Sequence, residues 1–193
     1  AGGLGDFGIG KFSKNMNNEI EVLLSRTLMQ RVIAELSLNV SYFIEGRVRD
    51  IEVYGKDVPI KLIINSLDSA AYGRAVSIRF KNNNTYVLEE ADGKISQHEF
   101  GQQVKKPYAT FTIVAAPGVS RDAISSGQKI IFVFQDTKRV ADYYNQVIMI
   151  FPNREDASVL RISLTDPIPE KGKSIINKLI EVYNKEAIED KNI

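Results

Sequence analysis

Cysteine is absent from this chain of 193 residues, and that absence removes several classes of protein. Without a thiol there is no disulfide framework, no zinc site built on cysteine and no nucleophilic cysteine. The absence does not identify a compartment, because a chain without cysteine is compatible with both reducing and oxidising surroundings.

Charge of one sign and long apolar runs are also missing. The chain has 25 basic and 24 acidic residues, whereas a protein that coats nucleic acid needs a clear basic excess. We therefore predict no nucleic-acid partner. The longest apolar runs, residues 130–134 and 147–151, are far shorter than the roughly 18 residues that span a bilayer. These residues are therefore expected to form a soluble fold.

The glycine-rich opening contains three patterns found in nucleotide-binding enzymes. They are Gly3, Gly5 and Gly8 for a dinucleotide fingerprint, Asp6 to Gly8 for the magnesium-binding triplet of protein kinases, and Gly5 to Lys11 for a P-loop. The fingerprint and the P-loop need a strand before the glycines, and the kinase triplet needs a catalytic loop elsewhere. The sequence has neither, and Phe12 stands where a P-loop has a hydroxyl residue. We interpret residues 1–17 as a flexible glycine-rich segment.

Two segments have apolar residues at helical spacing. In residues 18–37 they are Ile20, Leu24, Leu28, Val32 and Leu36, and in residues 170–193 they are Ile176, Leu179, Ile180, Tyr183 and Ala187. Asn18 and Glu21 resemble a capping box at the start of the first helix, and Asp166 and Pro169 are start signals for the second. The second pattern has no stop signal, so we expect its helix to continue past residue 193.

The region between these helices alternates with period two, which predicts strands. The expected strands cover residues 40–54, 60–65, 76–81, 85–90, 94–100, 108–115, 128–134, 146–151 and 158–165, with a short helix at 136–144. The sequence therefore predicts an α+β fold. Residues 18–42 and 119–193 would form a base in which a mixed sheet is flanked by helices, and residues 43–118 an inserted, mostly β module. The two long helices should lie against the strands near 130–135, 146–151 and 158–165.

The residues that carry chemistry in other proteins do not form a recognisable site here. His98 is the single histidine, and we expect it on the solvent face of a strand. Glu89, Glu90 and Asp92 cluster at a hairpin without the spacing of a calcium loop. We therefore predict no catalytic residue, no cofactor-binding residue, no metal ligand and no cofactor.

Two stretches, residues 17–54 and 158–192, contain motifs of a known family. The first has Glu19, Ile20, Glu21, Leu23, Ser25 and Arg26, followed by Glu45, Gly46, Arg47, Glu52 and Tyr54, and the second has Asp166, Pro167, Pro169, Ile176, Asn177, Leu179 and Tyr183. In these residues the chain resembles the extracytoplasmic region of bacterial polysaccharide co-polymerases, the chain-length determinant family. The exopolysaccharide tyrosine autokinases are the members that it resembles most.

This resemblance implies a periplasmic domain of an inner-membrane protein that regulates the length and export of a capsular polysaccharide or exopolysaccharide. It implies a ring-like homo-oligomer in the membrane-anchored protein, with a polysaccharide polymerase and an outer-membrane exporter as partners. The domain itself would not be an enzyme. The kinase members have a cytoplasmic tyrosine autokinase domain after these residues, and the sequence leaves open whether this protein has one.

Two rival functions come from other classes. One is a carbohydrate-binding module that contacts the exported polymer through exposed tyrosines, for which the candidates are Tyr42, Tyr54, Tyr143 and Tyr144. Tyrosines near strands are more often half-buried core residues. The other is an enzyme that uses His98 with a nearby carboxylate, and it requires convergent polar groups around that ring.

Overall fold

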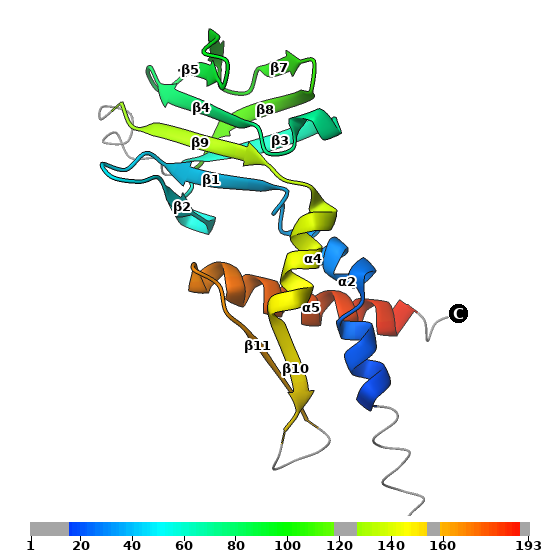
Figure 1. The fold of residues 1–193 in the computed structure, drawn as a ribbon. Helices are drawn as coiled ribbons and strands as arrows, with labels where there is room; N and C mark the ends of the chain where they lie inside the picture. The colour runs from blue at the N-terminus through cyan, green and yellow to red at the C-terminus, as the bar shows by residue number, and fades with distance from the viewer. Residues whose placement is uncertain (1–15, 118–126, 154–158, 190–193) are drawn as a thin grey trace, which may run out of the picture. The chain divides into compact units, whose positions relative to one another are not determined.

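The computed structural model describes residues 16–117, 127–153 and 159–189, and it divides the chain into two compact units. One unit, here called the helical unit, consists of residues 1–38 and 137–193 (Figure 1). The other, here called the β unit, consists of residues 39–136, where the sequence predicted an inserted module over 43–118. Nearly all of the glycine-rich segment, with its three nucleotide-binding patterns, lies outside the described residues.

The α+β class predicted from the sequence is confirmed, but the sheet is not mixed. Every pair of neighbouring strands among the described residues is antiparallel. Five of the eight pairs join strands that are consecutive in sequence, and their connections are too short for the crossover that parallel neighbours need. The predicted meander over residues 76–100 is present as three such strands.

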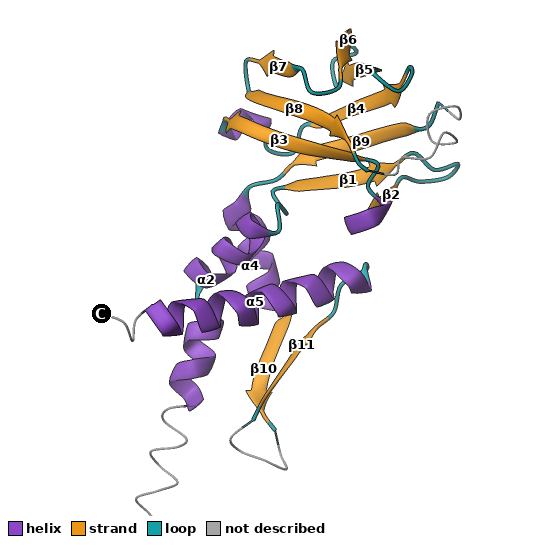
Figure 2. Cartoon of the chain, turned by 180° about the vertical axis from the view of Figure 1, so that it is seen from behind, coloured by secondary structure: helices purple, strands orange, loops and turns teal. Residues whose placement is uncertain are grey.

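Two sheets make up the β unit (Figure 2). The larger has the order β2-β1-β9-β4-β5-β6, and its strands are β1 (Val40–Ile44), β2 (Ile51–Val53), β4 (Ala75–Phe80), β5 (Thr85–Glu90), β6 (Ile95–Glu99) and β9 (Lys129–Phe134). The smaller has the order β3-β8-β7, with β3 (Ile60–Leu67), β7 (Gln103–Lys106) and β8 (Ala109–Ala115). Two short 3-10 helices, η1 (Gly55–Asp57) and η2 (Ser69–Ala71), lie in the connections.

The two sheets share one hydrophobic core, to which inward-facing residues of both sheets contribute. The centre of this core is aromatic, because Phe132 of β9 makes edge-on ring contacts with Phe111 of β8 at 5.8 Å and with Phe134 at 5.6 Å between centroids. All three side chains are fully buried. Burial of this apolar area is the main source of stability for the β unit.

The helical unit is built from both ends of the described chain. It contains a helix over residues 16–23, then α2 (Arg26–Glu35), α4 (Thr137–Val147), the hairpin of β10 (Ile148–Pro152) and β11 (Leu160–Leu164), and α5 (Pro169–Glu189). Helix α2 contacts both α4 and α5, and α5 also contacts β11. The buried apolar residues of this unit include Leu28, Met29, Val32, Ile33, Ala141, Tyr144, Ile175, Leu179 and Val182.

The single helix predicted over residues 18–37 is two helices. The chain leaves the helical conformation at Ser25, whose extended backbone and side chain cap α2 by accepting a hydrogen bond from the Leu28 amide at 3.3 Å. Asn18 lies inside the first helix and is not its cap. The four-residue apolar repeat continued through the break, but a serine favours a helix start over a helix interior.

The strand near residues 130–135, which the sequence placed in the base with the long helices, belongs instead to the β unit. As β9, it pairs with β1 and β4 in the middle of the six-stranded sheet. The other two strands of the predicted base are present, and they form the two-stranded hairpin β10-β11 in the helical unit. Apolar composition predicted that β9 is a buried strand, but it did not specify which strands pair with it.

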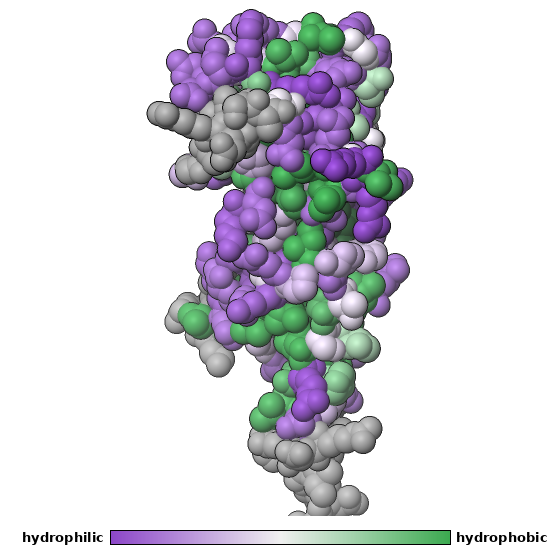
Figure 3. Space-filling view, turned by 90° about the vertical axis from the view of Figure 1, so that its left-hand side faces the viewer, coloured by the Kyte–Doolittle hydropathy of each residue, from purple (hydrophilic) through white to green (hydrophobic). Residues whose placement is uncertain are grey.

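Surface hydrophobicity is distributed over both units. Figure 3 shows one face of the molecule, where hydrophobic side chains reach the surface among hydrophilic ones. The exposed large apolar residues include Ile51, Ile63 and Ile95 in the β unit and Tyr143, Met149 and Phe151 in the helical unit. In the part of the chain that is described, no helix is both long enough and apolar enough to cross a bilayer.

Candidate functional site

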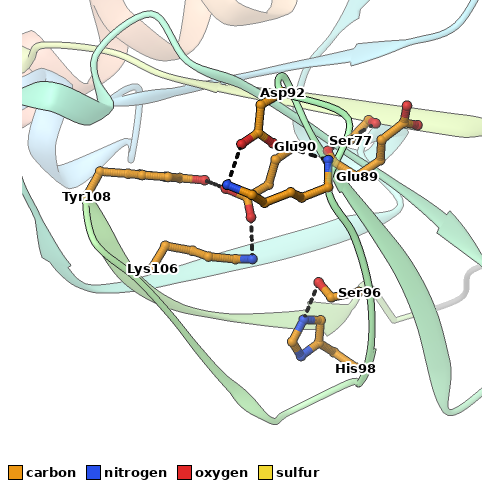
Figure 4. A network of polar contacts seen from close by, with 9 residues as sticks. Ser77, Glu89, Glu90, Asp92, Ser96, His98, Lys106 and Tyr108 are labelled. Atoms are coloured by element: carbon orange, nitrogen blue, oxygen red, sulfur yellow. Dashed lines mark hydrogen bonds and ion pairs between the residues drawn. The ribbon is translucent and has the colours of Figure 1, made fainter.

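A network of polar contacts in the β unit lies around the end of β5 (Figure 4). Two consecutive glutamates at this position point to opposite faces of the strand. Glu90 pairs in register with Val76, which faces the core, and Glu89 pairs with Ser77 on the outer face. Side chains directly opposite each other on an antiparallel pair share a face. Glu89 and Glu90 therefore belong to two different sites.

On the inner face, Glu90 is held by residues from the other sheet. Lys106 Nζ of β7 donates to Glu90 Oε1 at 2.5 Å, and the Tyr108 hydroxyl donates to Glu90 Oε2 at 2.8 Å. The side chains of Glu90 and Lys106 are only 14% and 16% exposed. The Arg74 guanidinium lies over the Tyr108 ring, 4.8 Å from its centroid. The ion pair between Glu90 and Lys106 therefore joins the two sheets at the edge of their common core.

The contacts of Glu90 set its protonation state. Burial alone would raise the pKa of Glu90, but the hydrogen bonds from Lys106 and Tyr108 outweigh burial and lower it. Burial, together with the hydrogen bond to Glu90, raises the pKa of Tyr108. The glutamate is thus a stable anion and the tyrosine a stable neutral donor, which suits a structural bond better than proton transfer.

We expect the Glu90→Gln variant to lose stability in a pH-dependent way. Because the folded-state pKa of Glu90 is lowered, its bonds stabilise the fold above the unfolded-state pKa of about 4.3. This stability is lost as the pH falls through the folded-state pKa. At neutral pH the variant should be about 1–3 kcal/mol less stable, as expected for hydrogen bonds to a charged group, and the difference should shrink in acid.

Urea unfolding of the wild type and Glu90→Gln at several pH values measures this difference. Glu99→Gln, which removes the same charge from an exposed position on β6, is the matched control and should have little effect. A stability difference for Glu90→Gln that stays constant from neutral to acid pH would contradict the assignment.

On the outer face, Glu89 forms one wall of a hollow of about 260 Å³. Lys129 Nζ of β9 reaches across β4 and contacts Glu89 Oε2 of β5 at 3.2 Å. The Ser77 hydroxyl, on β4 between them, donates to the backbone oxygen of Glu89 at 3.5 Å. The remaining lining includes Ala75, Ala91 and Ile131. The hollow thus has apolar walls and a small set of adjacent polar groups.

Local sequence explains why a hollow forms at this point. The outward residues of β4 are small at Ala75 and Ser77, so the longer side chains of the neighbouring strands stand above them. The turn after β5 closes the hollow at one end, because the Gly93 amide donates to the Glu90 carbonyl at 2.8 Å. Gly93 has φ of +82°, a left-handed conformation that favours glycine.

The sequence predicted that His98 lies on the solvent face of its strand, and this prediction is wrong. His98 lies opposite the fully buried Tyr86, with ring centroids 5.8 Å apart, and therefore faces inward. Its Nε2 forms a hydrogen bond with Ser96 Oγ at 2.9 Å. Burial, and secondarily the positive charge of Lys106, lower the pKa of His98. A Ser-His mechanism needs the ring to take up a proton, and both effects oppose this.

The acidic cluster predicted at residues 89–92 is a hairpin, but its acids do not converge. Glu89 contacts Lys129, Glu90 contacts Lys106, and Asp92 contacts Lys94 at 2.7 Å. Within the described ranges, no group of three or more histidine and acidic residues is arranged to hold a metal ion. The sequence located the acids but missed Lys106 and Lys129, because only the strand pairing brings them near.

The tyrosines named as sugar contacts do not form an aromatic platform. The Tyr42 hydroxyl accepts a hydrogen bond from the Leu62 amide at 3.3 Å, and this half-buried ring packs against the core of the β unit. Tyr144 is buried in the helical unit, where its hydroxyl donates to Asp166 Oδ2 at 2.7 Å. Tyr54 is partly buried, and Tyr143 is exposed.

Comparisons with known proteins do not assign a family to the chain. No family model matches it, and no curated protein matches it. Among solved structures it is similar to two crystal forms of FlgL from Xanthomonas campestris, with TM-scores of 0.28 and 0.25 and identities of 12% and 14%. The matches cover 75% and 76% of this chain but only 40% and 44% of FlgL. TM-scores this low support no conclusion about fold or function.

Proposed function

We propose that this chain is the periplasmic domain of an inner-membrane polysaccharide co-polymerase, which regulates the length and export of a capsular polysaccharide or exopolysaccharide. The domain acts as part of a homo-oligomer in the membrane-anchored protein, together with a polysaccharide polymerase and an outer-membrane exporter. It supplies shape and subunit contacts, and it has no catalytic role of its own.

The observation that carries this proposal is the contact between the two stretches with family motifs. They lie at opposite ends of the sequence, yet α2 of the first packs on α5 of the second. Arg31 Nη1 contacts Glu186 Oε1 at 3.0 Å, and Lys178 Nζ contacts Glu35 Oε2 at 3.6 Å. Leu179, a motif residue, is fully buried. The helical part of the first stretch therefore folds together with the second stretch in the helical unit, which supports the proposal, whereas residues 39–54 of the first stretch belong to the β unit.

A second motif, the Asp-Pro-x-Pro sequence before α5, has a clear structural role. Pro169 is the first residue of the helix, the position at which proline is favoured. Asp166 Oδ1 accepts a hydrogen bond from the Ile168 amide at 2.7 Å, and Asp166 Oδ2 accepts one from Tyr144 of α4. The motif thus fixes the start of α5 relative to α4, and this supports a role for these residues in shape and not in chemistry.

A ring is the assembly that this function requires, and it constrains the interface. A closed ring of identical subunits needs a heterologous contact, in which two different faces of one subunit meet. The membrane spans expected in the complete protein would hold the subunits at high local concentration, so each contact can be weak. The isolated domain is then expected to be largely monomeric in solution.

Disruption of the gene tests the proposed function in the cell. We expect the exported polymer to lose its normal length distribution, as measured by gel electrophoresis of purified polysaccharide, and the complete gene should restore it. Unchanged length and amount of every exported polysaccharide after disruption would rule out the proposed function.

A further inference from the structure

The hollow beside β4 is lined by a lysine and a glutamate from the two strands that flank β4. Lys129 Nζ and Glu89 Oε2 form an ion pair at 3.2 Å, which engages at most one of three ammonium donors and one of about four carboxylate acceptor sites. Unused donors and acceptors therefore lie side by side at the mouth of the hollow. Adjacent hydroxyls, each of which can donate and accept, are complementary to such a pair.

Charge narrows the class of ligand. The Lys129 and Glu89 charges cancel, and the side chain of Glu90, which points to the inner face of the sheet, is paired with Lys106. An anion such as phosphate would approach the Glu89 carboxylate, and a cation would approach the Lys129 ammonium. Either one would replace a favourable ion pair with a repulsive contact, so the hollow suits an uncharged ligand.

The size and the lining of the hollow restrict the class of ligand further. The volume of about 260 Å³ is below the roughly 300 Å³ at which pockets for drug-sized ligands begin, so the hollow accommodates one ring and not several. Ile131, Ala75 and Ala91 supply apolar contacts. A pyranose ring has this combination of character, with C–H groups on its faces and hydroxyls at its edge.

We propose that this hollow binds one hexopyranose ring of an uncharged polysaccharide, with Glu89 and Lys129 binding neighbouring hydroxyls and Ile131 packing against the ring. The hexose site itself is inferred from the hollow. That its ligand is the exported polymer rests on the function proposed above. Because a sugar chain is a repeat of such rings, weak sites on several subunits would together retain one polymer.

Site-resolved NMR titration of the chain with methyl hexosides tests the binding. Methyl glycosides of glucose, galactose, mannose and N-acetylglucosamine are the probes, with inorganic phosphate and glycerol for comparison. At least one hexoside should give saturable shifts of the Ser77, Glu89 and Gly93 amides. The absence of such shifts with every hexoside would overturn the proposal, and so would phosphate or glycerol binding as tightly as the best hexoside.

Variants of the hollow identify the side chains that bind the hexoside. Glu89→Gln and Lys129→Met should each weaken hexoside binding about tenfold or more, as expected for loss of a charge-assisted hydrogen bond. Glu99→Gln is the matched control, because Glu99 is exposed on β6 of the same sheet and does not line the hollow. Wild-type affinity in both hollow variants would show that the sugar binds elsewhere.

A cell experiment separates this site from the proposed function. If the complete gene product with Glu89→Gln still controls polymer length although the domain no longer binds hexosides, the exported polymer is not the ligand of this site. If gene disruption itself leaves polymer length unchanged, the co-polymerase function fails while the hexoside titration still decides the site.

Discussion

Replacement of Phe132 by alanine should lower the free energy of unfolding of the β unit by about 3–5 kcal/mol, the range for removing a large aromatic side chain from a packed core. Phe132 is fully buried at the centre of β9 and contacts Phe111 of the opposite sheet. The loss combines transfer of the ring from the core with a cavity that the two sheets cannot fill. Urea unfolding, monitored by tyrosine fluorescence, measures this loss in the free energy of unfolding.

The control for Phe132→Ala is Ile95→Ala, on the same sheet but 70% exposed, which should change stability by less than about 0.5 kcal/mol. Hydrogen exchange should show the largest loss of protection at amides of β4 and β9, the strands in register around Phe132. A decrease below about 1 kcal/mol would contradict the packing of the two sheets.

Asp166→Ala should be nearly as damaging in the helical unit. The Asp166 side chain is 1% exposed and receives hydrogen bonds from the Tyr144 hydroxyl and the Ile168 amide, with Lys171 Nζ at 3.7 Å. Removing one partner of a buried, hydrogen-bonded charge pair costs about 3–5 kcal/mol. Thermal unfolding followed by circular dichroism at a helix-sensitive wavelength measures the change.

Two further variants separate the roles of Asp166. Asp166→Asn keeps an acceptor for the Ile168 amide but removes the charge near Lys171, so its loss of stability should be intermediate. Asp142→Ala removes an aspartate from an exposed ion pair with Arg26, and its effect should stay below about 1 kcal/mol. Equal stability of Asp166→Ala and Asp142→Ala would show that the start of α5 does not depend on this carboxylate.

Local patterns predicted the helices and strands of this fold better than they predicted which strands pair and which elements pack together. The period-two alternation over residues 76–100 and the start signals at Asp166 and Pro169 were confirmed, because each depends on residues close in sequence. The break at Ser25 was missed because the apolar repeat of α2 continues across it. The position of β9 was missed because a buried apolar strand is compatible with many neighbours, and only the complete set of strand pairs selects β1 and β4.

The candidate site could be predicted only in part for the same reason. The acids at residues 89–92 were visible in the sequence, as was the hairpin that contains them. Ser77 and Lys129 are 52 residues apart in the chain, and they meet Glu89 only because β9, β4 and β5 are adjacent in the sheet. The sequence instead suggested tyrosines as sugar contacts, because aromatic residue type can be read without knowing the register.

The proposed function depends most on assembly, and the mass of the complete gene product in its membrane-extracted form tests this directly. Native mass spectrometry after gentle detergent extraction should give one closed oligomer of a fixed number of subunits. A uniform monomer under conditions in which the protein remains folded would contradict a ring-forming regulator of polysaccharide length.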